Sequence, residues 1–446
     1  MDARPDIAII SSYGRGNWLA SELRDLGLEV ALLDVSEAAG MHSPEDVEGP
    51  FGYFQSEKLS ASQKARLDQE DYSDSVDDGF VVWLKSGPID FRGPQAGELF
   101  KVLNQSESVR PYVERYDSTS DKGRSELVSK MKRELFEKNW VAQLAHSLAS
   151  PVAMPVNSHL QVGRPLPLFA PYSIRRVSRM GQEKALQGLK DKGVRIFSKA
   201  KIADVSVRGN EILSVEVSSQ WSGALTADQF IWALSSAETA RISKKAAELF
   251  FDSKVLESSW VWVRYRFEIR GEAYLSALPN RFLFIGDKAQ PWSHENFVWM
   301  QKTASSGLFD AWMRIPTFHR FQRSYHDALA GEAVRHIGAR LSGAEVKVYE
   351  FPQEYHYDES VLGPSRHQQY DFKAWRKHRV KSYRNILFDS PELWPMSDWN
   401  GQFEHQSQVL DKLKKWKTDR DLKLEKLRAK NLSIENQKSH SGDSLT

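Results

Sequence analysis

The sequence predicts an α/β protein of two domains, one Rossmann-like with a parallel central sheet and one α+β with a mixed or antiparallel sheet. Three observations lead to this class. A strand, a helix and a second strand follow one another within residues 1–35. Helical and strand-like segments then alternate through the middle of the chain. Residues 260–269 alternate large apolar and polar side chains, as a half-buried strand does.

The first unit is the clearest. The apolar run from Ile7 to Ile10 is strand-like, and residues 18–26 place their apolar side chains on one side of a helix. Gly27 suits the end of that helix, and residues 30–33 form a second apolar run. So short a strand–helix–strand unit predicts a right-handed crossover between parallel strands.

Later segments follow the same patterns. Ser86-Gly87-Pro88 predicts a β-hairpin, and residues 281–285 are expected to neighbour the strand at 260–269. A polar, disordered tail is expected over 431–446. The other predicted strands are 194–197, 202–207, 212–217, 230–234, 346–351 and 385–388, and the other helices are 125–148, 181–192, 320–341 and 402–430.

Composition excludes several classes of function. The chain has 61 basic and 59 acidic residues, so a net charge of +2 indicates no general attraction to nucleic acid. The absence of cysteine excludes disulfides and thiolate chemistry. No histidine spacing is typical of a metal site, so no metal is expected. No secretory signal and no apolar run long enough for a membrane span are recognised, so a cytoplasmic protein is expected.

The first turn carries a glycine pattern that indicates a dinucleotide site. Such a site needs a tight turn, bare backbone beside the diphosphate and close helix–strand contact, which glycine provides. Ser11 stands at the first glycine position, and Gly14 and Gly16 follow it, with Gly16 in the third glycine's place. Asp34 ends the second strand, where an acid binds a ribose hydroxyl.

Three stretches are similar to the flavin-dependent amine oxidase and protoporphyrinogen oxidase group. The run from Ile7 to Gly40 resembles the group's first unit, and residues 181–205 resemble its central segment, with Ile202 at the position whose backbone touches the adenine. Gly401-Gln-Phe-Glu404 resembles the start of its last helix, whose N-terminus favours anionic groups.

The resemblance implies non-covalently bound FAD and an oxidoreductase that transfers hydride from a small substrate to flavin. It also implies an FAD-binding domain in three segments, 1–90, 176–240 and 356–430, and a substrate domain of 91–175 and 241–355. The cofactor contacts it implies are Ser11, Gly14, Gly16, Asp34, Gly40, Ile202, Asp389 and Glu404.

The sequence departs from the group's pattern at several residues that would contact the cofactor. Tyr13 replaces the second glycine, where its Cβ and ring stand in the path of the diphosphate. Asp389 either substitutes for a lost acid that binds the flavin's sugar chain or caps a turn, and Gln406 replaces a glycine. Two functions therefore stay open: an FAD-dependent oxidoreductase, or a catalytically degenerate relative that keeps the fold as a scaffold or interaction module.

Catalytic and partner-binding candidates are fewer. His294 lies in a polar, aromatic loop and could act as an acid or base, while Tyr355 and Tyr357 match an aromatic pair that walls the group's substrate site. Structural packing is the alternative for all three. Residues 411–430 carry nine basic and four acidic side chains, a net +5, which indicates a solvated helix face or a surface that docks a protein partner.

Overall fold

The structure is a computed structural model of the 446-residue chain. It describes residues 4–12, 14–36, 53–54, 59–69, 74–77, 81–84, 87–90, 172–175, 179–218, 222–251, 259–271, 275, 278, 281–285, 297–303, 305–316, 319, 321–341, 344–351, 357–362, 380–390, 393 and 399–442. The helix predicted over residues 125–148 lies outside these residues.

A five-stranded parallel sheet forms the first layer. In space its order is β19-β12-β1-β2-β8, so in chain order it reads 3-2-1-4-5 from the other edge, the order of doubly wound dinucleotide-binding folds. The predicted parallel pairing of the first two strands is confirmed, because β1 pairs with β2 in register from Ile7↔Val30 to Ser11↔Asp34. The strands are β1 Ile7–Ser11, β2 Val30–Asp34, β8 Arg195–Phe197, β12 Gln229–Ala233 and β19 Ile386–Phe388.

The helices beside this sheet end as their glycines predict. Helix α1 (Asn17–Asp25) is followed by Gly27 at φ +77°, and α8 (Arg179–Asp191) by Gly193 at φ +85°. In each case the glycine N–H and the next N–H donate to carbonyls of the last turn, as in a Schellman motif. Glycine is favoured at both positions because a side chain there is strained.

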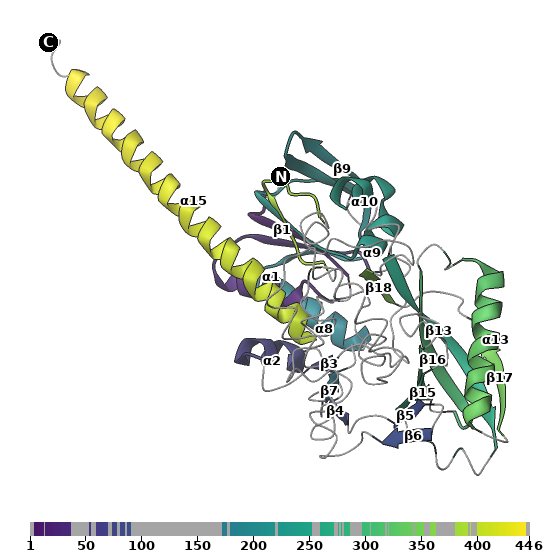
Figure 1. The fold of residues 1–446 in the computed structure, drawn as a ribbon. Helices are drawn as coiled ribbons and strands as arrows, with labels where there is room; N and C mark the ends of the chain where they lie inside the picture. The colour runs from purple at the N-terminus through teal and green to yellow at the C-terminus, as the bar shows by residue number, and fades with distance from the viewer. Residues whose placement is uncertain are drawn as a thin grey trace, which may run out of the picture.

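An eight-stranded, mostly antiparallel sheet forms the second layer, with α13 (Arg323–Arg340) and β17 at one side of the molecule (Figure 1). The predicted hairpin is confirmed as β5 paired with β6. Hydrogen bonds join both strands to this sheet and not to the parallel one. The strands are β5 Val81–Leu84, β6 Gly87–Asp90, β13 Ser259–Arg270, β14 Arg281–Ile285, β15 Phe297–Lys302, β16 Leu308–Pro316, β17 Glu345–Glu350 and β18 Tyr357–Leu362.

The expected pairing of β13 with β14 is wrong. Strand β13 pairs with β16, β17 and β18, and strands β15 and β16 separate it from β14. The cause is the two antiparallel strands at 297–316, which the sequence patterns did not reveal. Strand β15 pairs with β14 and β16 pairs with β15, so β14 lies three places from β13.

Two three-stranded sheets and four more helices complete the described structure. The sheets are β11-β10-β9 and β3-β7-β4. Their strands are β3 Tyr53–Phe54, β4 Asp74–Asp77, β7 Tyr172–Arg175, β9 Lys201–Arg208, β10 Glu211–Ser218 and β11 Ser222–Leu225, and the helices are α2 Ala61–Gln69, α9 Ser236–Ile242, α10 Lys244–Phe250 and α15 Trp399–Gly442.

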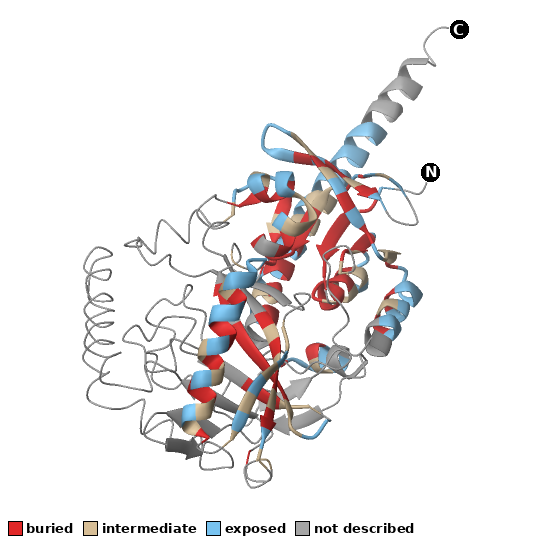
Figure 2. Ribbon diagram, turned by 90° about the vertical axis from the view of Figure 1, so that its right-hand side faces the viewer, coloured by how far each residue is buried: buried red, intermediate tan, exposed pale blue. Residues whose placement is uncertain are grey.

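Apolar cores lie on both faces of the parallel sheet. One joins Ile10 and Trp232 to sheet β11-β10-β9 and helix α10, and the other joins Ile9 and Leu19 to the start of α15. A third core lies between the eight-stranded sheet and α13. Figure 2 shows buried residues gathered along the strands, with exposed residues on the outward side of the helices.

Helix α15 packs on the body at its beginning and then projects away from it (Figure 1). The Trp18 and Phe403 rings meet edge to face, with 5.6 Å between their centroids, where α15 crosses α1. The helix continues to Gly442, so residues 431–442, expected as a disordered tail, are helical. Within the described residues, no helix combines the length and the apolar character needed to cross a membrane.

Candidate functional site

The predicted site lies at the carboxyl edge of the parallel sheet, between β1 and β12. Because Ser11 pairs with Ala233 at the strand ends, the turn after β1 lies beside the turn after β12. This is the point where the strand order reverses, and doubly wound sheets bind their ligands there. The segment after β19 reaches the same edge, since the Asp389 N–H donates to the Trp232 carbonyl over 2.9 Å.

The amide donors of the first turn are bonded within the turn. The Arg15 N–H donates to the Ser12 carbonyl over 3.1 Å, and the Asn17 N–H to the Gly14 carbonyl over 2.9 Å. The Gly16 N–H donates to Ser11 Oγ over 2.7 Å. N–H groups at the start of a helix are those that bind a diphosphate in dinucleotide folds. Here three of them already have acceptors in the chain itself.

Gly16 has the geometry expected of the third glycine. A Cβ on Gly16 would lie 2.8 Å from Ile9 Cγ2 and 3.0 Å from Ser11 Cβ. Only a residue without Cβ lets α1 approach β1 this closely. Gly14 has φ +70°, the left-handed conformation that favours glycine.

Replacing Gly16 by alanine is expected to lower the free energy of unfolding by about 1–3 kcal/mol, because the new methyl group overpacks the contact with Ile9. A urea melt of each variant measures this. Gly188→Ala in α8 is the matched control: nothing lies within 4 Å of its Cβ, so the helix gains up to about 1 kcal/mol. Equal effects of the two changes would contradict the tight contact.

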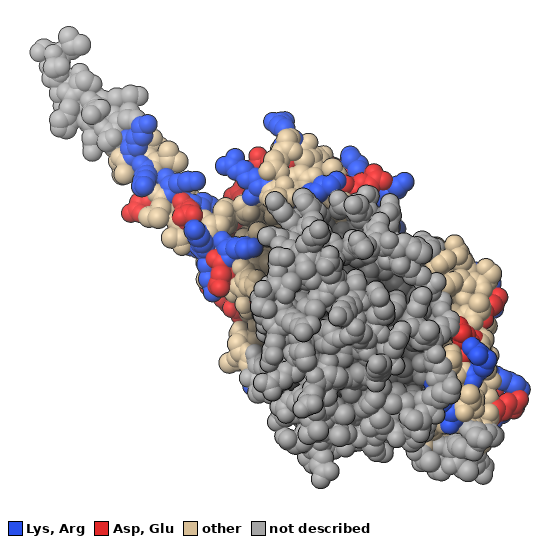
Figure 3. Space-filling model, in the orientation of Figure 1, with Lys and Arg blue, Asp and Glu red and all other residues tan. Residues whose placement is uncertain are grey.

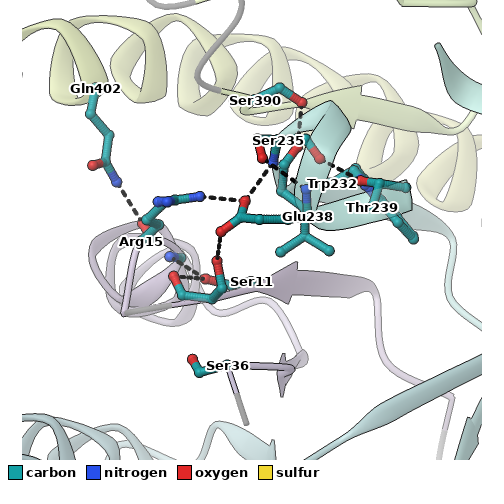
Figure 4. A network of polar contacts seen from close by, with 12 residues as sticks. Ser11, Arg15, Ser36, Trp232, Ser235, Glu238, Thr239, Ser390 and Gln402 are labelled. Carbon is teal, nitrogen blue, oxygen red and sulfur yellow. Dashed lines mark hydrogen bonds and ion pairs between the residues drawn. The ribbon is translucent and has the colours of Figure 1, made fainter. Parts of the chain in front are cut away.

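A buried ion pair links the turn after β1 to the turn after β12. Arg15 Nη1 lies 2.6 Å from Glu238 Oε2 (Figure 4). Ser12 Oγ donates to Glu238 Oε1 over 2.8 Å. Arg15 is 6% exposed and Glu238 is fully buried. Both carboxylate oxygens of Glu238 are therefore used by the turn that would receive a diphosphate.

Glu238 is held in place by its own helix. It is the third residue of α9, whose N-cap is Ser235, and the two form a capping box. The Ser235 N–H donates to Glu238 Oε2 over 2.6 Å, while the Glu238 N–H donates to Ser235 Oγ over 3.1 Å. Ser235-Ser-Ala-Glu238 has the spacing that predicts a capping box, and this signal could have identified Glu238 from the sequence.

The start of helix α15 also contacts the turn after β1. Gln402 Nε2 and Gln406 Nε2 both donate to the Arg15 carbonyl, over 3.1 Å and 2.7 Å. Gln406 Nε2 also donates to Asp389 Oδ2 over 2.6 Å. Gln406 and Asp389 are fully buried. Within the described part of the chain, Gln406 Oε1 is a buried acceptor that receives no hydrogen bond.

Of the other predicted cofactor contacts, Asp34 and Ile202 lie close together and Glu404 is exposed. Asp34 ends β2, half-buried, and its Oδ1 accepts from the Ser36 N–H over 3.1 Å and from Ser36 Oγ over 2.5 Å. The Ala200 N–H donates to the Asp34 carbonyl over 2.9 Å, which brings the start of β9, with buried Ile202, close to it. Glu404 is exposed on α15.

Several predicted residues lie outside the described residues. These are Tyr13, Gly40, His294 and Tyr355. Tyr357 begins β18 and pairs with Trp262 of β13, so its backbone belongs to the eight-stranded sheet. The catalytic roles assigned to His294, Tyr355 and Tyr357 stay predictions.

His405 ties α15 to the parallel sheet and makes stability depend on pH. Its Nε2 lies 2.9 Å from the Phe388 carbonyl, so Nε2 carries a proton that it donates to this oxygen. Burial lowers the pKa of His405 below its ordinary value near 6.5, and the bond to Phe388 partly opposes this. The unfolded chain therefore binds this proton more strongly than the folded chain.

The free energy of unfolding is expected to fall as the pH drops below about 6.5, because the contribution of neutral His405 is present above its ordinary pKa and is lost below it. Urea melts over a pH series measure this. His405→Gln keeps a donor for Phe388 and should flatten the profile over this range. His319→Gln, at a half-buried position bonded to Gln322, is the control and should keep the fall in stability that His405→Gln removes. A profile unaltered by His405→Gln would contradict the assignment.

The comparisons with known proteins find similarity of fold. No protein-family model matches the chain, and no curated protein matches its sequence. The structure of putrescine oxidase bound to putrescine aligns with a TM-score of 0.54 at 11% identity, over 92% of this chain and 99% of that one. An oxidoreductase from Methanosarcina mazei aligns with a TM-score of 0.52 at 13% identity, over 91% and 99% of the two chains. At such identities the likeness shows the fold alone, which this chain shares with these two proteins.

Proposed function

We propose that this chain is a non-catalytic relative of the flavin amine oxidases that keeps the fold as a scaffold. The observation that carries the proposal is the buried Arg15–Glu238 pair in the turn where a dinucleotide's diphosphate would lie. Oxidoreductases of this fold need the flavin for hydride transfer, since their side chains do not supply that chemistry. A chain that cannot hold the diphosphate keeps only the architecture.

Hydrogen bonding in the first turn supports this proposal. A diphosphate is bound by N–H groups that point out of the helix start. The N–H groups of Arg15, Gly16 and Asn17 have acceptors inside the turn, so a diphosphate would have to break these bonds. The turn as it stands does not fit the group.

Electrostatics oppose a diphosphate as well. The Arg15 guanidinium is already neutralised by Glu238. If Arg15 turned toward a phosphate, the fully buried Glu238 carboxylate would lose its partner. An uncompensated buried charge costs about 3–5 kcal/mol, which the new contact would first have to recover. The pair therefore stabilises the closed turn against the ligand.

The test is whether the full chain takes up FAD. The purified protein is expected to be colourless, and added FAD should keep the fluorescence of free flavin. A variant carrying Ser11→Gly, Tyr13→Gly and Arg15→Ser, with Glu238→Gln to avoid a bare buried charge, is expected to quench that fluorescence. Opening the turn should thus create binding that the natural chain lacks.

A second candidate function is the FAD-dependent oxidoreductase that oxidises an unknown small substrate. It is favoured by Gln406 Oε1, a buried acceptor that, among the described residues, receives no hydrogen bond. A hydroxyl of the flavin's sugar chain would satisfy it, beside Asp389. Asp34 would accept a bond from a ribose hydroxyl, and bound flavin would accept the hydride.

The same purification separates the two candidates. A yellow preparation of the natural chain, with flavin bands that disappear in Asp34→Ala, would overturn the scaffold proposal in favour of the oxidoreductase. Asp25→Ala is the matched control, because Asp25 lies exposed on α1 and is paired with Lys192 at 2.9 Å, away from the turn. Colour lost equally in both variants would indicate general destabilisation, and the scaffold proposal would still fail because the natural chain bound flavin.

A further inference from the structure

The outer half of helix α15 carries exposed leucines. At its start, Phe403, Leu410 and Leu413 are buried against α1 and the parallel sheet. Arg420 marks the edge of the body, paired with Asp6 over 2.5 Å and lying 4.8 Å above the Trp416 ring. Beyond this point the helix projects away, and the exposed leucines on it are Leu422, Leu424, Leu427 and Leu432.

One stripe runs along residues 410–431 of the helix. Positions 410, 413, 417, 420, 424, 427 and 431 are spaced alternately by three and four residues, as in the seam of a helix that packs on another helix, and leucine occupies four of them, 410, 413, 424 and 427. The inner part of this stripe, with Leu410 and Leu413, is already packed on the body. The outer part, with Leu424 and Leu427 at 45% and 55% exposure, continues the same face past the edge of the body.

Basic side chains border the outer stripe on both sides. Lys423 and Lys430 lie along one side and Arg428 lies along the other. The acidic residue at the fourth bordering position, Asp421, is paired with Lys417 on the same helix over 2.6 Å. Figure 3 shows this concentration of Lys and Arg on the projecting helix.

We propose that the outer stripe of α15, residues 420–432, docks an α-helix of a partner protein whose apolar seam is bordered by Asp and Glu. Leucines 424 and 427 would pack into that seam, and Lys423, Arg428 and Lys430 would pair with the acidic borders. The inference does not depend on whether the chain binds flavin.

A second copy of this chain fits less well. In a parallel pair, Lys423 of one helix would face Arg428 of the other, and like charges at these positions oppose association. An anionic membrane fits less well too, because Leu422 and Leu432 lie off the stripe and basic residues lie on several sides. A surface helix on a membrane gathers its apolar residues on one face.

The test uses the full chain and two synthetic helical peptides with the same leucine seam, one bordered by glutamate and one by lysine. Fluorescence anisotropy is expected to detect binding of the glutamate peptide, weakened by added salt, and much weaker binding of the lysine peptide. Leu424→Ser with Leu427→Ser is expected to reduce affinity by at least about tenfold. Leu422→Ser with Leu432→Ser is the matched control and should bind as the natural chain does.

Four results would overturn the inference. Equal binding of both peptides would show that charge does not determine recognition. An equal loss of affinity in the stripe and control variants would show that the stripe is not the binding surface. A natural chain that is a dimer by light scattering, and a monomer after Leu424→Ser and Leu427→Ser, would assign the stripe to a second copy. Binding to anionic phospholipid vesicles but not to the glutamate peptide would assign it to a membrane. Circular dichroism confirms that each variant keeps its helix.

Discussion

Replacing Glu238 by alanine is expected to lower the free energy of unfolding by about 3–5 kcal/mol, because it leaves the buried Arg15 guanidinium without its counter-ion. The change also removes the acceptor for Ser12 Oγ and half of the capping box that starts α9. Equilibrium unfolding in urea, followed by circular dichroism, measures the loss.

Two further variants show whether charge or hydrogen bonding is responsible. Glu238→Gln keeps an acceptor of the same shape but removes the charge. Its free energy of unfolding should therefore lie between those of the natural chain and Glu238→Ala. The double variant Arg15→Met with Glu238→Leu removes both charges and should lose less than Glu238→Ala alone. If Glu238→Ala cost less than about 1 kcal/mol, the pair would not be buried as described.

Replacing Trp232 by alanine is expected to cost about 3–5 kcal/mol, the range for a large aromatic side chain removed from a packed core. Trp232 lies on β12, inside the parallel sheet, and is 1% exposed. Its ring packs edge to face on Phe250, with centroids 4.6 Å apart, and its Nε1 donates to Thr239 Oγ1 over 2.8 Å. A cavity there would separate β12 from both α9 and α10.

The size of this effect is checked against milder changes. Trp232→Phe keeps a ring and should lose less, since Thr239 Oγ1 still donates to the Ser235 carbonyl. Trp416→Ala removes the same side chain from a partly buried position on α15 and should cost clearly less than Trp232→Ala. Similar losses for Trp232→Ala and Trp416→Ala would show that burial in the parallel sheet does not set the cost.

Much of the parallel sheet could be predicted because its signals are local. The apolar run from Ile7, the helical spacing after Trp18 and the glycines at 27 and 193 each act within a few residues. The structure has these strands and helix ends where they were expected. The order of strands in the eight-stranded sheet was not predictable in the same way. Pairing there depends on β15 and β16, which lie between β13 and β14 in space.

The candidate site, too, could be predicted only where its signals are local. Gly16 was predicted to allow close helix–strand contact, and the contact with Ile9 is that close. Asp34 was predicted at the end of β2, where it lies. Glu238, however, is 223 residues from Arg15, and no local pattern connects them. Gln406 was recognised only as a replaced glycine, and its bonds to Arg15 and Asp389 arise from how α15 crosses the sheet edge.

The amino-acid sequence by itself determined the strand–helix–strand unit, its glycine-dependent turn and the acid at the end of β2. Each of these follows from backbone freedom and side-chain periodicity over a few neighbouring residues. Only the tertiary structure decided that this turn is closed by an ion pair. The parallel register of β1 with β12, Ser11↔Ala233, brings Arg15 and Glu238 together, and burial then makes their separation costly.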